Sequence, residues 1–364
     1  MNRRIKILCV VGARPNFIKI APLFEEFKRY KTIKPILVHT GQHYDFEMSQ
    51  VFFQELKIPK PDYNLEVGSG THAWQTAKIM EKLEPVILKE KPDLVIVVGD
   101  VNSTLAGVLT AIKLNIPVAH IEAGLRSFDM SMPEEINRVL TDHISTFLFC
   151  PTKTVVKNLK KEGIKKGIYN VGDIMYDTFL KYFKIVQKKS QILKKLNLKP
   201  KSYLLLTLHR SSNVDNLGNL KNILEAIGKS GEKVVFPVHP RTKKQLNKLK
   251  HLSTYKLTNF QFIDPVGYLD MLCLEKNAKK IITDSGGMQK EAYWVKVPCI
   301  TLRSTTEWVE TIKSGWNILV ATNKEKIIKA IKNFNPKRKQ FKYFGNGRAA
   351  KKIVKILKFK FNGK

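Results

Sequence analysis

The chain has 364 residues, of which 43% are apolar, and charges are interspersed along it, so its composition indicates a globular protein of about two domains. No apolar run approaches the roughly 20 residues of a membrane-spanning helix, and the apolar start of the chain lacks a small-residue cleavage site. Four cysteines stand far apart without CxxC spacing, so we expect a cytoplasmic protein with buried free thiols at Cys9, Cys150, Cys273 and Cys299.

The formal net charge of +33, from 64 basic and 31 acidic residues, favours anionic partners. Much of the excess is lysine at helical spacing, as at Lys351, Lys355 and Lys358, without the interleaved arginine, glycine and aromatic residues of RNA-binding modules. Solvated helix faces explain these lysines better than an RNA-binding protein does, and we expect no nucleic-acid partner. Whatever the origin of the lysines, the positive electrostatic field of the protein would attract a small anionic substrate.

Short apolar runs bounded by Gly, Pro and Asp alternate with helical segments. The first six predicted strands are 5–11, 35–39, 94–98, 117–121, 147–150 and 168–171. After a predicted helix over 174–197, six more follow at 203–208, 233–238, 260–263, 280–283, 298–302 and 318–320. Runs without polar alternation, such as Leu94 to Val98, are typical of parallel sheets covered on both faces. The pattern predicts two doubly wound α/β domains, over 1–172 and 173–345, with a ligand between them at the carboxyl ends of the strands.

Charged residues follow several predicted strands of the first domain. Arg14 and Lys19 come after the first strand, where two cations can bind a diphosphate, although Lys19 is equally consistent with a surface lysine. Asp100 follows the third strand, where it could simply cap a helix. Glu122 follows the fourth and has no capping role that we can identify.

A predicted helix that begins at Pro133 carries Glu134 and Arg138 four positions apart. Such a pair, taken alone, is more often a surface ion pair than a functional one. In the second domain, His209 and Arg241 follow two predicted strands in the same way. The repeated placement of polar groups at strand ends favours a site there.

The predicted strand 280–283 runs through Asp284 into Ser285, Gly286 and Gly287 and then into a helical pattern. The two glycines let the backbone approach a ligand, and the first free N–H groups of the helix, with Ser285 as N-cap, form an anion site that fits a phosphate. Glu291 lies one to two turns further along, where it could accept hydrogen bonds from a sugar hydroxyl. On spacing alone, an ordinary glycine-rich turn is an equally good interpretation.

Searches for other sites are negative. The chain contains no GxxxxGK[ST], HExxH or GxSxG motif. A loose GxGxxA at 68–73 follows residues 63–67, which make a poor buried strand, so a dinucleotide site there is disfavoured. The eight histidines show no pair at metal-ligand spacing, and we predict no metal.

Several segments together resemble the UDP-N-acetylglucosamine 2-epimerases, from about residue 5 to about residue 320. They are Gly12 to Pro15 with Ile18 to Leu23, Thr40 to His43, Gly99 with Asp100, His120 to Arg126, Pro133 to Arg138, and Thr283 to Gly287 with Gln289 and Glu291. The resemblance implies a GT-B architecture, in which two Rossmann-like domains face a cleft and a C-terminal helix, here within 346–364, crosses back to the first domain. It also implies interconversion of UDP-GlcNAc and UDP-ManNAc, with the nucleotide held by the second domain, and we expect a homodimer.

By position, the resemblance gives catalytic roles to Asp100, Glu122, Glu134, Arg138 and His209. It gives substrate or UDP contacts to Arg14, Lys19, His209, Arg241, Met271, Ser285, Gly286, Gly287, Glu291 and Arg303, and a regulatory role to Gln42 and His43. Four positions depart from the family pattern. Ser212 stands where an acidic residue is usual, Trp308 where an arginine is frequent, Met271 where an aromatic residue often covers the uracil, and Asp45 where bacterial members have a further glutamine among the regulatory contacts.

Inversion at C2 of the sugar requires removal of a proton that no carbonyl makes acidic. One route oxidises C3 and needs NAD, for which the sequence offers only the weak motif at 68–73. The other expels UDP from C1 as C2 loses its proton, forming a 2-acetamidoglucal, and then adds UDP back; it needs cations for the diphosphate and acid–base groups on both faces of C2. We therefore expect a non-hydrolysing epimerase without a cofactor. A hydrolysing epimerase that releases ManNAc and UDP, and a GT-B glycosyltransferase, are the alternatives.

Overall fold

The computed structural model describes residues 4–42, 55–250 and 257–361, and the chain divides into two compact units. Unit 1 comprises Met1–Lys181 and Lys342–Lys364, and unit 2 comprises Tyr182–Phe341. The borders predicted after 172 and 345 lie near these divisions. Helix α7 (Ile174–Lys189) begins in unit 1 and ends in unit 2, so the division falls within a helix.

Unit 1 is built on a seven-stranded parallel sheet with the order β3-β2-β1-β4-β5-β6-β7. Its strands are β1 (Ile5–Val11), β2 (Ile33–His39), β3 (Tyr63–Asn64), β4 (Leu94–Val98), β5 (Val118–Ile121), β6 (Phe147–Cys150) and β7 (Ile168–Asn170). Its helices are α1 (Arg14–Phe27), α3 (His72–Glu90), α4 (Asn102–Lys113), α5 (Pro133–Ile144), α6 (Lys153–Lys161), the first half of α7, and α16 (Ala349–Phe361).

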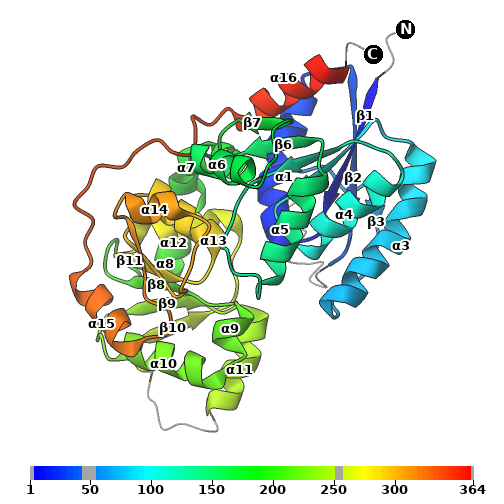
Figure 1. The fold of residues 1–364 in the computed structure, drawn as a ribbon. Helices are drawn as coiled ribbons and strands as arrows, with labels where there is room; N and C mark the ends of the chain where they lie inside the picture. Colours follow the sequence, from blue (N-terminus) through cyan, green and yellow to red (C-terminus); the bar gives the residue numbers. More distant parts are fainter. Residues whose placement is uncertain (1–3, 43–54, 251–256, 362–364) are drawn as a thin grey trace. The chain divides into compact units, whose positions relative to one another are not determined.

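Helix α16 belongs to unit 1 although it ends the described chain. It packs beside α1 (Figure 1), and the Phe361 ring lies 6.1 Å from the Phe147 ring of β6. Asp177 of α7 accepts hydrogen bonds from the backbone N–H groups of Ala349 and Ala350 at 3.1 and 2.9 Å. These contacts satisfy two of the N–H groups that a helix start leaves without intrahelical partners.

Unit 2 is built on a six-stranded parallel sheet with the order β10-β9-β8-β11-β12-β13. Its strands are β8 (Leu204–Thr207), β9 (Val234–Pro237), β10 (Phe260–Ile263), β11 (Lys280–Thr283), β12 (Cys299–Thr301) and β13 (Asn317–Leu319). Its helices are α8 (Ile192–Lys195), α9 (Ser211–Val214), α10 (Leu217–Gly228), α11 (Pro240–Lys250), α12 (Tyr268–Asn277), α13 (Gly286–Trp294), α14 (Val309–Lys313) and α15 (Lys324–Asn333).

The prediction of two doubly wound parallel-sheet domains is confirmed, and each predicted strand has an observed counterpart. Strand β3 was missed because it is only two residues long. The predicted helix over 174–197 is in fact two helices. They separate at Ser190, whose hydroxyl donates to Asp270 at 2.6 Å and accepts the N–H of Ile192 at 3.3 Å. The four cysteines are free and buried, as expected. Within the described ranges, no helix is both long and apolar enough to cross a membrane.

Both sheets reverse their strand order at one point, between β1 and β4 in unit 1 and between β8 and β11 in unit 2. In doubly wound sheets, ligands bind outside the carboxyl ends of the strands at this switch point. Residues that follow these four strands are therefore the first places to look for a site in each unit.

Candidate functional site

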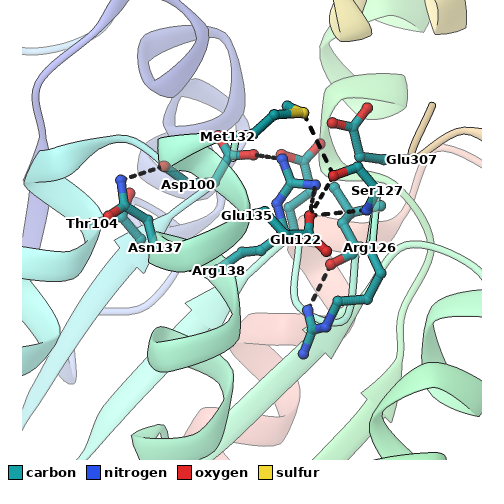
Figure 2. Close-up of polar contacts among 12 residues, drawn as sticks. Asp100, Thr104, Glu122, Arg126, Ser127, Met132, Glu135, Asn137, Arg138 and Glu307 are labelled. Carbon is teal, nitrogen blue, oxygen red and sulfur yellow. Dashed lines mark hydrogen bonds and ion pairs between the residues drawn. The ribbon is translucent and has the colours of Figure 1, made fainter. Parts of the chain in front are cut away.

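In unit 1, Asp100 and Arg138 form a partly buried contact just beyond β4. Arg138 of α5 donates from Nη2 to Asp100 Oδ2 and from Nη1 to Glu135 Oε2 at 2.9 Å (Figure 2). Asn137 Nδ2 donates to the backbone oxygen of Asp100 at 2.9 Å. The interpretation of Glu134 and Arg138 as a surface pair does not hold, because Arg138 is only 2% exposed. Asp100 does not cap α4 either, since the N-cap is Val101 without a side-chain hydrogen bond.

Glu135 is the most heavily hydrogen-bonded carboxylate of this region. It accepts from Ser127 N–H and Oγ at 2.9 and 2.8 Å, from Phe128 N–H at 2.9 Å, and from Arg138 (Figure 2). Its side chain therefore fixes the loop after Arg126 and orients Arg138. Glu134, the predicted catalytic neighbour, is half-buried in the first turn of α5.

Lys19 and Glu122 form a buried ion pair. Lys19 Nζ donates to Glu122 Oε2, and both residues are 7% exposed. Glu122 has a φ of 75°, in the left-handed region that residues other than glycine rarely adopt, and its N–H donates to Phe149 O at 3.1 Å. Such strained backbone positions cluster at functional sites. A Cβ at Gly99, whose φ is 71°, would lie 3.2 Å from Lys19 Nζ, so the glycine makes room for the pair.

A buried hydrogen-bond network of His120, Asp142 and Arg126 supports the backbone near Asp100 and Glu122. His120 of β5 contacts Gly99 O through Nε2 at 2.8 Å and Asp142 Oδ1 through Nδ1 at 2.7 Å. Asp142 also accepts from Gly124 N–H at 3.0 Å and from Arg126 Nη1 at 2.6 Å. Burial tends to raise the pKa of Asp142, but its bonds to His120 and Arg126 lower it overall. The network thus holds the backbone at Gly99, next to Asp100, and at Gly124, two residues after Glu122.

Of three further predicted residues that follow β1 and β2, the structure describes the side chain of Gln42 alone. Gln42 is buried, and its Oε1 accepts hydrogen bonds from Ser103 Oγ at 2.6 Å and Ser103 N–H at 3.2 Å. His43, its predicted regulatory partner, lies outside the described residues. Arg14 begins α1, but its side chain is also outside the described part of the structure.

In unit 2, the turn after β11 has the predicted strand–turn–helix form. Ser285 is the N-cap of α13, and its Oγ accepts the N–H of Met288 at 3.5 Å. The N-cap role predicted for Ser285 is confirmed. A Cβ at Gly286 would lie 3.3 Å from Trp308 Nε1, so the indole packs closely against the start of the helix. Gly287 lies in the same first turn.

Asp284 ties this turn to the end of β8. It is fully buried and accepts from the N–H groups of His209 and Arg210 at 3.2 and 3.0 Å and from Asn213 Nδ2 at 3.2 Å. Its Oδ1 lies 3.1 Å from His209 Nδ1. Burial tends to raise the pKa of Asp284, but His209 and the backbone N–H donors lower it overall. This carboxylate fixes the orientation of the His209 ring beside the turn.

The remaining predicted residues of unit 2 differ in environment. Arg303 is buried and makes two hydrogen bonds to Glu307, at 2.8 and 3.0 Å. Arg241 is half-exposed and pairs with Asp215 at 2.6 Å. Met271 is a half-buried residue of α12.

Next to the turn, α13 carries two buried charged side chains. Glu291 is 6% exposed, and Lys290 is 1% exposed. Lys290 Nζ lies 3.9 Å from the centre of the Trp308 ring, a cation–π geometry. Trp308, which stands where the family pattern has arginine, therefore brings an aromatic face rather than a charge.

Sequence reasoning did not single out the acidic residues that orient the predicted groups: Glu135, Asp142, Asp284 and Glu307. Asp142 and Asp284 have partners far away in sequence, as with Asp284 and His209, which are 75 positions apart. Glu135 and Glu307 pair with arginines three and four positions away, a spacing that in a sequence is also typical of surface ion pairs. A buried carboxylate one residue beyond a strand was a signal available for Asp284. The other three lie in helices or loops and look like ordinary surface acids in the sequence.

Known proteins are similar to this chain in both sequence and structure. The sequence model of the UDP-N-acetylglucosamine 2-epimerase family matches residues 25–358. A UDP-N-acetylglucosamine 2-epimerase homolog of Methanococcus maripaludis is 57% identical over 97% of this chain and 99% of its own. A UDP-2,3-diacetamido-2,3-dideoxy-D-glucuronate 2-epimerase of Pseudomonas aeruginosa is 44% identical over 97% and 99%. The crystal structure of the Methanocaldococcus jannaschii UDP-GlcNAc 2-epimerase in complex with UDP-GlcNAc and UDP is 49% identical, with a TM-score of 0.92 over 98% of this chain and 100% of that one.

Proposed function

Because this chain belongs to the UDP-N-acetylglucosamine 2-epimerase family and is an isomerase of GT-B fold, we propose that it interconverts UDP-GlcNAc and UDP-ManNAc without hydrolysing them. The observation that carries the proposal is the placement of Asp100, Glu122 and Glu134 beyond the central strands of unit 1. A glycosyltransferase would share the fold and the nucleotide site but has no need of three carboxylates there.

The proposed reaction begins with loss of UDP from C1 and of the proton from C2. The leaving diphosphate gains negative charge, so it needs preorganised donors and cations. The N-terminal end of α13 at Gly286 supplies free backbone N–H groups, and Ser285 adds a hydroxyl. His209, oriented by Asp284 at 3.1 Å, is the third group that supports this role in unit 2.

The proton transfers fall to the carboxylates of unit 1. A positioned acid or base must be held within hydrogen-bonding reach of the proton that it moves. Asp100 is held by Arg138, and Glu122 is held by Lys19 and by its backbone contact to Phe149. We assign to Asp100, Glu122 and Glu134 the removal of the C2 proton on one face by one group and the delivery of a different, solvent-exchangeable proton on the other face by another group. Arg14 and Lys19 are assigned to the diphosphate side.

A related enzyme from Pseudomonas aeruginosa supports a second candidate substrate, a UDP-diacetamido sugar acid. The Pseudomonas aeruginosa enzyme, at 44% identity, is a 2-epimerase for UDP-2,3-diacetamido-2,3-dideoxy-D-glucuronate. That sugar inverts at the same carbon but carries an extra carboxylate, which a chain of net charge +33 would attract. The same elimination chemistry serves both substrates.

The test is to incubate the purified protein with each UDP-sugar, without added NAD, and to follow the products by NMR. We expect an equilibrium between UDP-GlcNAc and UDP-ManNAc. Free ManNAc with UDP would instead identify a hydrolysing enzyme. Turnover of the UDP-diacetamido sugar alone would show that this sugar, and not UDP-GlcNAc, is the substrate. No change in either sugar would overturn the proposal.

A further inference from the structure

Two buried carboxyl groups face each other in unit 2. Glu275 of α12 is 1% exposed and Glu291 of α13 is 6% exposed. The two helices pack together, and the Glu275 carboxyl lies within hydrogen-bonding reach of Glu291. Glu291 stands on the helix that Ser285 caps and Gly286 begins, so this contact involves the same helix as the proposed nucleotide site.

Glu275 has no donor for either of its oxygens among the described residues. An ionised carboxylate can only accept hydrogen bonds, so two ionised groups in contact repel each other and leave acceptors without protons. One proton on the pair removes a buried charge and creates a hydrogen bond between the two groups. Consistent with this, burial first and then the neighbouring Glu291 raise the pKa of Glu275 well above its usual value.

The surrounding titratable groups are neutral in their ordinary state. Burial, followed by Glu291 and Glu275, raises the pKa of Tyr268, which lies on α12 beside Glu291. Tyr203 donates its hydroxyl hydrogen to Leu274 O at 2.7 Å, and Cys299 of β12 is a buried thiol whose pKa burial raises. The Tyr182 ring lies 5.9 Å from that of Tyr268. Tyr268, Tyr203 and Cys299 have raised pKa values and stay protonated near neutral pH, so the two glutamates are the acidic groups of this cluster.

We propose that Glu275 and Glu291 share one proton, and that Glu275 is a positioning residue that holds Glu291 in the orientation in which it accepts hydrogen bonds from the ribose of the nucleotide. The role of Glu291 toward ribose rests on the proposed function. Loss of the shared proton at high pH would leave two adjacent anions and turn Glu291 away from its position. UDP affinity should therefore be highest below the pH at which the pair loses this proton and fall as pH rises through it.

The decisive variants are Glu275→Gln, whose amide supplies a permanent donor of similar size, and Glu275→Leu, which supplies none. UDP binding by calorimetry across pH should weaken about tenfold in the wild type as the pair ionises, which is the worth of about one hydrogen bond to a charged group. Glu275→Gln should bind UDP nearly as well as the wild type at low pH and show a flat profile. Glu275→Leu should bind about tenfold more weakly at every pH. Unfolding midpoints check that each variant is folded.

Infrared spectroscopy tests the shared proton without any ligand. The unliganded wild type at neutral pH should show the C=O stretch of a protonated buried carboxyl, and Glu275→Gln should lack it. Absence of this band from the wild type, or a wild-type pH profile of UDP binding in Glu275→Gln, would overturn the inference. If the wild type does not bind UDP at all, the proposed function fails, whereas the infrared band still decides whether the proton is shared. If Glu275→Leu does not fold, Glu275→Gln and the infrared band decide the question alone.

Discussion

Glu134 and Glu135 are adjacent carboxylates with different surroundings. Glu135 is 1% exposed and accepts four hydrogen bonds, from Ser127, Phe128 and Arg138, whereas Glu134 is half-buried at the start of α5. Glu135 therefore holds the structure, whereas Glu134 is available for chemistry. Sequence motifs place both in one segment and do not separate these roles.

Glu134→Gln and Glu135→Gln should therefore fail in different ways. We expect Glu134→Gln to lower turnover by about 10²-fold or more, the usual worth of a positioned acid or base, with little change in unfolding midpoint. Glu135→Gln should destabilise the protein by about 3 kcal/mol, because it removes the anion that pairs with buried Arg138. Steady-state kinetics and urea unfolding of both variants check this. A stable, inactive Glu135→Gln beside an active Glu134→Gln would reverse the assignment.

At the scale of single elements, α16 depends on Asp177 of α7. The Asp177 carboxylate accepts from the first two N–H groups of α16, while burial raises its pKa to about 6 from its usual 3.8. The folded state therefore binds this proton more tightly than the unfolded state. The stabilisation that comes from the protonated Asp177 carboxyl is fully present below about pH 4 and is lost as pH rises toward and beyond 6.

Two substitutions separate the charge of Asp177 from its hydrogen bonds. Asp177→Asn should remove this pH dependence between about 4 and 6 from the free energy of unfolding. Asp177→Ala should cost about 1 kcal/mol at neutral pH and speed hydrogen exchange in α16, because it removes a helix cap. Glu25→Ala, at an exposed ion pair with Lys181, is the matched control and should change stability by less than about 0.5 kcal/mol. Unchanged exchange in α16 of Asp177→Ala would contradict the anchoring role.

The elements also indicate what the sequence can predict. Strands 5–11, 94–98, 147–150, 260–263 and 280–283 were predicted with their observed bounds, because short, mainly apolar runs between turn residues are distinctive. The two-residue strand β3 and the break at Ser190 were missed, since each depends on tertiary contacts. The same limit applies to the site. Residues at strand ends could be found, but the carboxylates of α5 that orient other groups, Glu135 and Asp142, could not.

At the scale of the whole molecule, each unit holds part of the groups assigned to one substrate. The carboxylates and the predicted phosphate cations Arg14 and Lys19 lie in unit 1, and the Ser285 turn lies in unit 2. If one UDP-sugar uses both sets, binding should favour a more closed arrangement. The homodimer and the cytoplasmic location stay predictions.

Solution X-ray scattering tests this requirement. Saturating UDP should lower the radius of gyration of the wild type, and Glu291→Ala should need a higher UDP concentration for the same change. Scattering from a matched concentration of uridine, which lacks the diphosphate, serves as the control and should show a smaller effect. An unchanged radius of gyration in saturating UDP would count heavily against a shared site.

In the proposed reaction, C2 is inverted by elimination and re-addition of UDP, with acid–base groups acting on both faces. Running the reaction in D₂O with UDP-GlcNAc and no added NAD tests this claim directly. We expect deuterium at C2 of UDP-ManNAc and of recovered UDP-GlcNAc at equilibrium, with C3 unlabelled. Asp100→Asn and Glu122→Gln should each slow this labelling by about two orders of magnitude or more. Products that carry only protium at C2, or an absolute requirement for NAD, would contradict it.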